Sequence, residues 1–114
     1  MWYFVLKVSP KPDTELEKDA GGAFVNCWIN FREKDGAENL AKFYLAQEGW
    51  NYEETQEANW VEEQDYDNDP EGIQHFSEAE TDSACFVVHQ WPANDREELE
   101  EHRAPSLTRE PPQL

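Results

Sequence analysis

Positive charge is the property that this sequence has least of. Only 9 of the 114 residues are Lys or Arg, against 26 Asp and Glu, which gives a formal net charge of −17. Proteins that bind nucleic acids or anionic membrane surfaces use Lys and Arg to neutralise phosphate groups. We therefore expect no nucleic acid and no membrane among the partners of this protein.

Cysteine is also scarce, and no long apolar run is present. The two cysteines, Cys27 and Cys85, are fewer than a secreted disulfide scaffold of this size usually carries. The apolar run at residues 1–8 lacks a basic segment and a cleavage-like site, and it is too short to span a bilayer. These absences predict a cytoplasmic protein with two free thiols.

What the sequence has instead is a strongly patterned segment from Ala23 to Phe31, in which every second residue is apolar. Alternation with a period of two predicts a strand with one buried face. Residues 2–8 and 84–91 show a similar pattern, and a further extended segment runs from about 50 to 63. The link between the first two strands is short for a parallel crossover, so we expect an antiparallel pair.

Two helices are expected between these strands. The segment that starts at Asp35 carries an apolar stripe at helical spacing, and Asp35 with Glu38 has the spacing of a capping box. The second helix begins at Asp69, a capping residue that is followed by Pro70 at the first helical position. Apolar residues on both parities of 84–91 predict that this strand is central in the sheet.

The expected order of elements is strand, strand, helix, strand, helix, strand (ββαβαβ). It predicts an α+β fold, a two-layer sandwich in which two helices cover one face of a four-stranded sheet. We expect one domain over residues 1–92 and a charged, proline-containing tail over residues 93–114. The expected core consists of Val25, Cys27, Ile29, Phe31, Leu40, Tyr44, Ile73, Phe76 and Val87.

This order of elements resembles the ferredoxin-like group of small α+β domains, with the order shifted. The segment ENLAKFYLAQEGW at residues 38–50, in which a helix runs into a Gly-Trp strand, is similar to a segment of small uncharacterised bacterial proteins. The resemblance covers about residues 23–91 and includes no catalytic motif. It implies a scaffold that often dimerises through its sheet, and it implies no activity.

The negative charge is concentrated in one interval of the chain. No Lys or Arg occurs from Phe43 to Asn94, and this interval holds 13 of the 26 acidic residues. Such an interval is either a solvated face that keeps the protein soluble or a surface that attracts a basic partner. In the second case the predicted binding residues are Glu62, Glu63, Asp65 and Asp67.

Part of this interval has the beginning of a calcium-binding pattern. Asp65, Asp67 and Asp69 match the first three ligand positions of an EF-hand loop. Pro70 then occupies the position that requires glycine, and Phe76 the position that requires a bidentate Glu. A turn followed by a helix cap explains the same residues, so we expect no metal site and no cofactor.

A second candidate surface lies on the other parity of the central strand. There, Phe24, Asn26, Trp28 and Asn30 alternate aromatic and amide side chains. If both helices cover the opposite face, these four residues face solvent, and exposed aromatic patches are typical of interfaces. They predict a homodimer that forms through the sheet. Packing against neighbouring strands is the alternative.

The histidines and cysteines show no catalytic spacing. Cys85 and His89 share a parity on one strand, but residues four apart on a strand are about 13 Å apart, too far for a nucleophile and its base. A metal cluster of both cysteines and one histidine lacks the close cysteine spacing of zinc sites. The pattern therefore favours ordinary core residues over a catalytic site.

The sequence favours a non-enzymatic, acidic interaction module that self-associates through its sheet and binds a basic protein partner. Two alternatives remain open. The first is an acidic inhibitor, of the immunity type or a nucleic-acid mimic, which binds one cognate protein tightly. The second is a small-ligand enzyme that uses the cleft between sheet and helices, with His75 or His89 as acid or base. It requires a histidine that lines a pocket beside a carboxylate.

Overall fold

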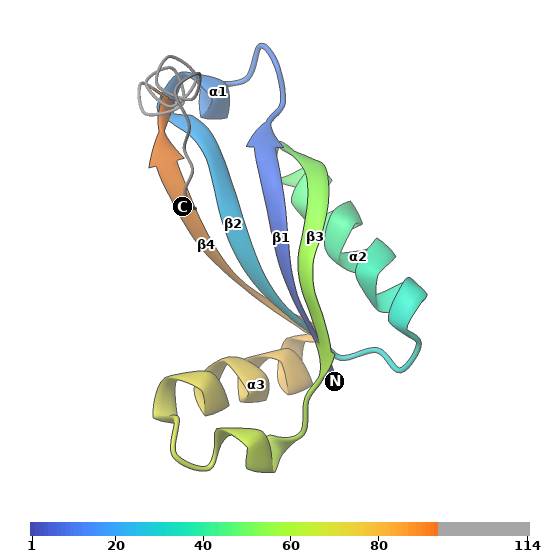
Figure 1. Ribbon diagram of the computed structural model, residues 1–114. Coiled ribbons are helices and arrows are strands. Elements are labelled where there is room, and N and C mark those ends of the chain that lie inside the picture. The colour runs from blue at the N-terminus through green and yellow to red at the C-terminus, as the bar shows by residue number, and fades with distance from the viewer. Residues whose placement is uncertain (94–114) are drawn as a thin grey trace, which may run out of the picture.

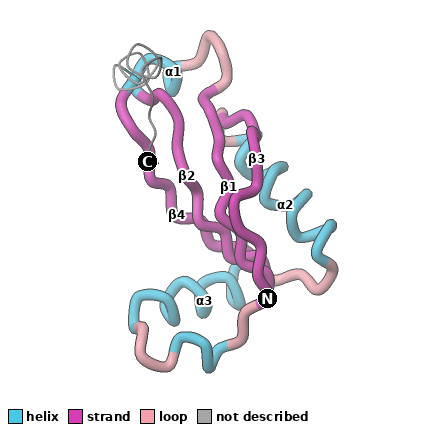
Figure 2. The backbone as a smooth tube through the Cα atoms, viewed as in Figure 1, coloured by secondary structure: helices cyan, strands magenta, loops and turns pink. Residues whose placement is uncertain are grey.

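Four antiparallel strands form one open sheet in the computed structural model, which describes residues 1–93 (Figure 1, Figure 2). The strands are β1 (Trp2–Pro10), β2 (Ala20–Ile29), β3 (Trp50–Trp60) and β4 (Ala84–Pro92). Their order across the sheet is β3-β1-β2-β4. The α+β class and the antiparallel pairing of the first two strands are confirmed. The strand order does not confirm a ferredoxin-like arrangement.

Within the described residues, three α-helices and one 3-10 helix connect the strands. α1 (Glu15–Asp19) follows β1, α2 (Lys34–Gln47) follows β2, and the 3-10 helix η1 (Glu63–Tyr66) with α3 (Pro70–Asp82) follows β3. None of these helices has the length and apolar character that a bilayer crossing requires. The tail predicted over residues 93–114 lies outside the described part of the chain, apart from its first residue.

Local signals account for two helix ends as predicted. The Asp69 side chain accepts a hydrogen bond of 3.0 Å from the backbone N–H of Gly72, and Pro70 follows in the first turn of α3. After α2, Gly49 adopts a φ of 100°, a left-handed conformation that a residue without a side chain takes at little strain. The start of α3 and the end of α2 each depend on residues that are close together in sequence, and for this reason the sequence predicts them.

The capping box predicted for the start of α2 is wrong. The helix begins at Lys34, before Asp35, and its capping residue makes no side-chain hydrogen bond. Glu38 instead accepts a hydrogen bond from the hydroxyl of Thr55 on β3. A contact across the helix–sheet boundary therefore replaces the local bond that the spacing predicted.

The two long helices pack on opposite faces of the sheet, so the prediction that both cover one face is wrong. α2 joins a buried cluster that includes Cys27, whereas α3 joins a second cluster that includes Trp28. Adjacent residues of a strand point to opposite faces, and these two are adjacent on β2. Large apolar side chains occur on both parities of β2, and each face requires its own cover.

α2 and α3 cover very different shares of the sheet. Figure 1 shows α2 running along the sheet, while α3 crosses one end of it, far from α1. Over most of its length the sheet therefore has one helical layer. The cluster beneath α2 is the main core, and its buried members are Phe4, Leu6, Val8, Ala20, Ala23, Val25, Cys27, Ile29, Ala37, Ala41, Leu45 and Trp50.

Two residues of the predicted core are exposed. Phe31 is 44% exposed and Tyr44 is 36% exposed. β2 ends at Ile29, two residues earlier than predicted, so Phe31 lies beyond the strand, where its ring lies against Gly36 in the first turn of α2. The buried members of the predicted core are Val25, Cys27, Ile29 and Phe76, while Leu40, Ile73 and Val87 are partly buried.

β4 lies at an edge of the sheet, which corrects the prediction that it is central. Its apolar residues occur on both parities because each face has a helix to pack against. Cys85 and Val87 contact the cluster of α3, and Phe86 contacts the cluster of α2. Farther along the strand Val88 is 42% exposed, as expected for an edge.

Candidate functional site

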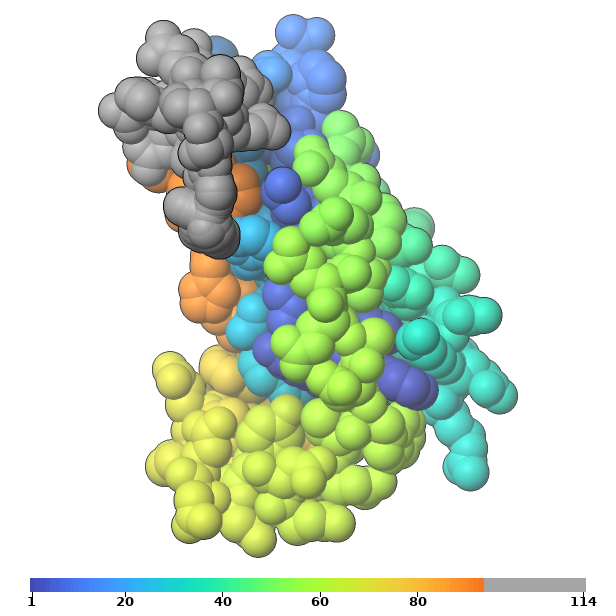
Figure 3. Space-filling view, viewed as in Figure 1, coloured from blue at the N-terminus to red at the C-terminus, as the bar shows by residue number. Residues whose placement is uncertain are grey.

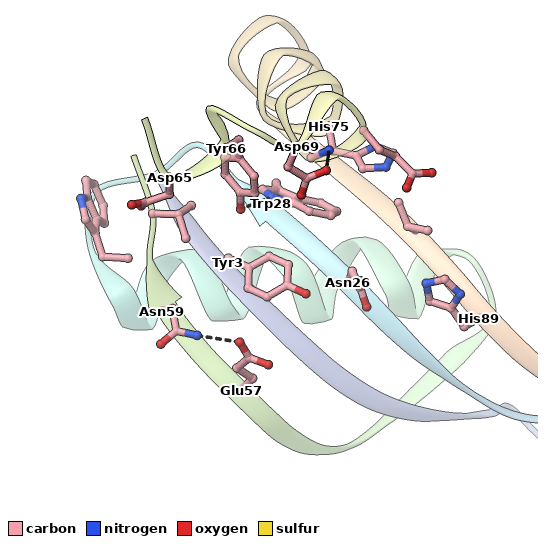
Figure 4. A pocket seen from close by; sticks show the side chains of 15 residues that line it. Tyr3, Asn26, Trp28, Glu57, Asn59, Asp65, Tyr66, Asp69, His75 and His89 are labelled. Carbon is pink, nitrogen blue, oxygen red and sulfur yellow. Dashed lines mark hydrogen bonds between the residues drawn. The ribbon is translucent and has the colours of Figure 1, made fainter. Parts of the chain in front are cut away.

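The face of the sheet that carries Trp28 is hollowed into a groove of about 700 Å³ beside η1 and α3 (Figure 3, Figure 4). In Figure 3, β1 and β2 are visible between β3 and β4 above α3. We call this hollow the acidic groove. Its sheet residues are Tyr3, Asn26, Trp28, Glu57, Asn59, Trp60, Val87 and His89, and its remaining residues are Val61, Asp65, Tyr66, Asp69, Glu71, Gly72 and His75.

Trp28 organises one end of the groove. Its side chain is only 5% exposed, and its indole Nε1–H donates a hydrogen bond of 2.9 Å to the hydroxyl of Tyr66. Its ring lies 5.0 Å from the ring of Tyr3 and 4.8 Å from that of His75, centroid to centroid. Gly72 allows Tyr66 to approach α3, because a Cβ at that position would clash with the tyrosine ring.

Carboxylates give the groove its charge. Glu57, Asp65, Asp69 and Glu71 line it, and none of the lining residues within the described part of the chain is Lys or Arg. Burial raises the pKa of the Tyr66 hydroxyl, and the nearby Asp65, Asp69 and Glu57 raise it further, while the hydrogen bond from the Trp28 indole lowers it. Burial and the negative charges therefore both oppose the formation of phenolate at Tyr66.

Three of these carboxylates also hold local structure. Asp65 Oδ2 accepts a hydrogen bond of 2.8 Å from the backbone N–H of Glu62, and Asp69 caps α3. Glu57 Oε2 accepts a hydrogen bond of 2.7 Å from Asn59 Nδ2. These bonds agree with the interpretation of residues 65–69 as a turn and a cap. Asn or Gln can accept the same bonds, so the charges can be removed while the contacts are kept.

The binding residues predicted from the sequence lie partly in this groove and partly outside it. The prediction that Trp28 faces solvent is wrong, because α3 covers its ring. Phe24 lies farther along the same face and packs on Trp91, with ring centroids 5.3 Å apart, and Asn30 is exposed beyond the end of β2. The three predicted binding residues that line the groove are Asn26, Trp28 and Asp65.

The other predicted acidic residues lie outside the lining. Glu62, Glu63 and Asp67 are exposed in and beside η1. Sequence reasoning missed the remaining polar and aromatic members because they come from separate elements. Tyr3, for example, pairs in register with Trp28 on one side and with Asn59 on the other. The missed residues are Tyr3, Glu57, Asn59, Trp60, Tyr66, Asp69 and Glu71.

At the junction of α3 and β4, a thiol, an imidazole and a carboxylate meet. Cys85 Sγ lies 3.7 Å from His75 Nδ1 and donates a hydrogen bond of 3.3 Å to Glu78 Oε1. His75 Nδ1 lies 3.7 Å from the same carboxylate oxygen. We call these three residues the Cys-His-Glu cluster. Cys27 does not take part, because it lies in the core on the other face, and the strand neighbour His89 is not a member either.

The Cys-His-Glu cluster does not have the electrostatics of an activated nucleophile. Burial, together with the hydrogen bond to Glu78, raises the pKa of the Cys85 thiol to about 11. Nucleophilic cysteines instead have a lowered pKa, which nearby cations provide. The geometric requirement of the enzyme alternative, a groove-lining histidine beside a carboxylate, is met by His75.

Comparisons with models of protein families, with curated proteins and with solved structures find no match to this chain. Its function is therefore inferred from the acidic groove and the Cys-His-Glu cluster themselves.

Proposed function

We propose that this protein is a non-enzymatic interaction module whose acidic groove binds a basic segment of a partner protein. One observation carries the proposal: four carboxylates and three aromatic rings line a single groove, and none of its lining residues within residues 1–93 is Lys or Arg. The carboxylates are Glu57, Asp65, Asp69 and Glu71, and the rings are those of Tyr3, Trp28 and Tyr66.

Arg and Lys side chains match this lining in two ways. Their cationic heads pair with carboxylates, and the guanidinium of Arg also stacks on aromatic faces. Their long apolar stems pack on rings such as those of Tyr3 and Tyr66. The volume of about 700 Å³ lies within the usual range for binding pockets, which is enough for one or two inserted side chains.

The test removes three charges from the groove without removing hydrogen bonds. In the variant Glu57→Gln, Asp65→Asn and Asp69→Asn, each new amide oxygen can still accept the local bond of the carboxylate it replaces. We expect affinity for an Arg-containing peptide, measured by calorimetry, to fall about tenfold. Partly exposed charge pairs are worth about 0.2–1 kcal/mol each, and three act together here.

The matched control removes the same charge at the opposite end of the sheet. Asp13→Asn, Glu15→Gln and Asp19→Asn alter exposed residues in and beside α1. We expect a clearly smaller loss of affinity, because only the long-range field changes. If the two triple variants lose peptide affinity equally, the acidic residues attract the peptide only through the net charge of the protein, and the groove proposal fails. The same peptide with Gln in place of Arg measures binding that does not depend on charge.

The natural partner is sought by pull-down from the source cell at low and at high salt. Electrostatic capture predicts a basic protein whose association slows as salt is added. A single cognate protein that binds tightly and is inhibited by this chain would instead favour the inhibitor alternative.

Self-association through the sheet is a separate part of the proposed function. With Trp28 covered by α3, the remaining aromatic pair on that face is Phe24 with Trp91. We expect Phe24→Ala to shift sedimentation toward monomer, and Phe43→Ala, which alters a 57% exposed ring on α2, to leave it unchanged. A wild-type chain that is monomeric at high micromolar concentration would rule out the dimer.

A further inference from the structure

The Cys-His-Glu cluster combines three metal-binding chemistries in one place. Cys85 supplies a thiol, His75 an imidazole and Glu78 a carboxylate, and their donor atoms all lie within 4.8 Å of one another. Together these are the ligand types by which proteins bind zinc. The cluster is distinct from the carboxylates of the acidic groove, although His75 lines both.

The distances within the cluster match the edges of a tetrahedral zinc site. Zinc lies about 2.3 Å from sulfur and about 2.0–2.2 Å from nitrogen and oxygen, so tetrahedral ligand atoms lie about 3.3–3.6 Å apart. The corresponding separations are 3.7 Å from Cys85 Sγ to His75 Nδ1, 3.3 Å from Cys85 Sγ to Glu78 Oε1, and 3.7 Å from His75 Nδ1 to Glu78 Oε1. A zinc ion therefore fits with shifts of a few tenths of an ångström.

The surrounding structure holds these ligands in place before any ion binds. His75 and Glu78 are three residues apart on α3, which puts them on one side of the helix. The ring of His75 is packed at 4.8 Å on the buried indole of Trp28. Ser83 adopts a left-handed φ of 78° at the end of α3, and this turn returns the chain so that Cys85 lies beside the helix.

The charges around the cluster favour a cation. Glu78 belongs to the cluster, and Asp82 lies one turn farther along α3. Their negative field attracts a divalent ion, and the thiol proton is released when the ion binds. Within residues 1–93, His75 is the only basic group recorded in an ion pair with Glu78.

From this geometry we propose that Cys85 Sγ, His75 Nδ1 and Glu78 Oε1 bind one Zn²⁺ ion and leave its fourth tetrahedral position to water. Mixed sulfur, nitrogen and oxygen ligands in this geometry select zinc over Mg²⁺ or Ca²⁺, which prefer more oxygen ligands. The sequence did not predict this site, because Cys85 lies on a different element from His75 and Glu78 and the spacing of the three residues matches no known zinc motif.

Cobalt substitution tests the site directly, because Co²⁺ bound to a thiolate has a charge-transfer absorption that Co²⁺ bound only to carboxylates lacks. We expect the wild-type chain to show this band, one equivalent of Co²⁺ to saturate it, and Zn²⁺ to abolish it by displacement. Cys85→Ser should remove the band, and Cys27→Ala, which removes the buried thiol on the other face, should keep it.

Two further pairs of variants separate ligands from nearby residues. Glu78→Gln should weaken Zn²⁺ binding more than about tenfold, while Glu80→Gln on the same helix should not. His75→Gln should also weaken Zn²⁺ binding. His89→Gln, which alters the other groove-lining histidine, should leave Zn²⁺ binding unchanged. Zn²⁺ affinity that is unchanged in Cys85→Ser and Glu78→Gln would show adventitious binding by acidic groups and overturn the proposal.

A measurement on the unmodified chain guards against variants that fail to fold. Cys85 is partly exposed and Cys27 is fully buried, so iodoacetamide should react first with Cys85 in the folded protein. One equivalent of Zn²⁺ should slow this reaction, whereas the same amount of Mg²⁺ should not. A rate that Zn²⁺ leaves unchanged would overturn the proposal independently of any substitution.

Discussion

The two faces of this sheet are built from alternate residues of the same strands, yet they differ in burial and in the side chains that they carry. Beneath α2, Phe4, Leu6 and Val25 are completely buried. On the other face, Tyr3 and Asn26 are only partly buried, and a groove with four carboxylates lies above them. The first face supplies apolar burial, and the second supplies aromatic and charged groups that remain accessible.

The difference follows from how much of each face a helix covers. α2 runs along the sheet and excludes water from a continuous apolar surface, which is the main source of folding free energy. α3 covers Trp28 at one end and leaves the rest of its face without a helix (Figure 1). A small domain can in this way bury one face of its sheet for stability and leave much of the other face open to solvent.

The largest expected effect tests the apolar face. Ile29→Ala removes a side chain that is 1% exposed, and we expect the free energy of unfolding to fall by about 2–5 kcal/mol, from lost burial and from the cavity left behind. Urea denaturation measures the change. Val88→Ala, at a position that is 42% exposed, should change stability by less than about 0.5 kcal/mol. Similar losses for the two variants would contradict the assignment of the core.

A smaller effect tests the polar face. Tyr66→Phe removes the acceptor for the buried indole N–H of Trp28, and an unpaired buried donor costs about 1–3 kcal/mol of stability. The control is Tyr52→Phe, which removes a hydrogen bond to Thr55 from a ring that is 39% exposed. The control should lose about 0.5 kcal/mol or less. If Tyr66→Phe is equally harmless, water reaches Trp28 and α3 is only loosely packed.

Alkaline pH should test the burial of Cys27 on the apolar face. Burial raises the pKa of this thiol far above its ordinary value of 9.0. As the pH rises above about 9, the unfolded chain releases the proton and the folded chain retains it, so the unfolding free energy falls with pH. Below that pH the contribution is fully present. Cys27→Ala should make the fall shallower in urea titrations at pH 8 to 10, and an unchanged slope would mean that the thiol is solvated.

The smallest effect concerns salt. Like charges in the acidic interval repel one another, and salt screens this repulsion beyond a Debye length of about 8–10 Å. We expect sodium chloride to raise the melting temperature of the free protein slightly. The Glu57→Gln, Asp65→Asn and Asp69→Asn variant should show less of this dependence. A melting temperature that falls with salt would indicate that attractive ion pairs dominate instead.

A reversal of charge at Glu62, Glu63 and Asp65, which the sequence alone would suggest as a test, is a poor design in view of the structure. Glu62 and Asp65 form a reciprocal capping box around η1, in which each side chain accepts a hydrogen bond from the backbone of the other. Lysine at these positions would remove the cap as well as the charge. The amide substitutions at Glu57, Asp65 and Asp69 separate the two effects.

The sequence by itself determined the elements whose signals lie within a few residues of one another. The cap at Asp69, the stripe of Ile73, Phe76 and Ala79, and the alternation along β2 all follow from local hydrogen bonds and from the repeat of the backbone. The antiparallel pairing of β1 and β2 follows from a short connection. The concentration of acidic residues is likewise a property of the sequence alone.

Only the tertiary structure decided which face each helix covers, and with it the two candidate sites. Trp28 could face solvent or a helix with the same alternation, and the position of α3 places it under cover. Tyr3 and Glu57 reach the groove from two different strands, and Cys85 reaches His75 through the turn at Ser83. Periodicity assigns a residue to one face of its own element, but the contacts between elements depend on packing and strand register, which arise from the chain as a whole.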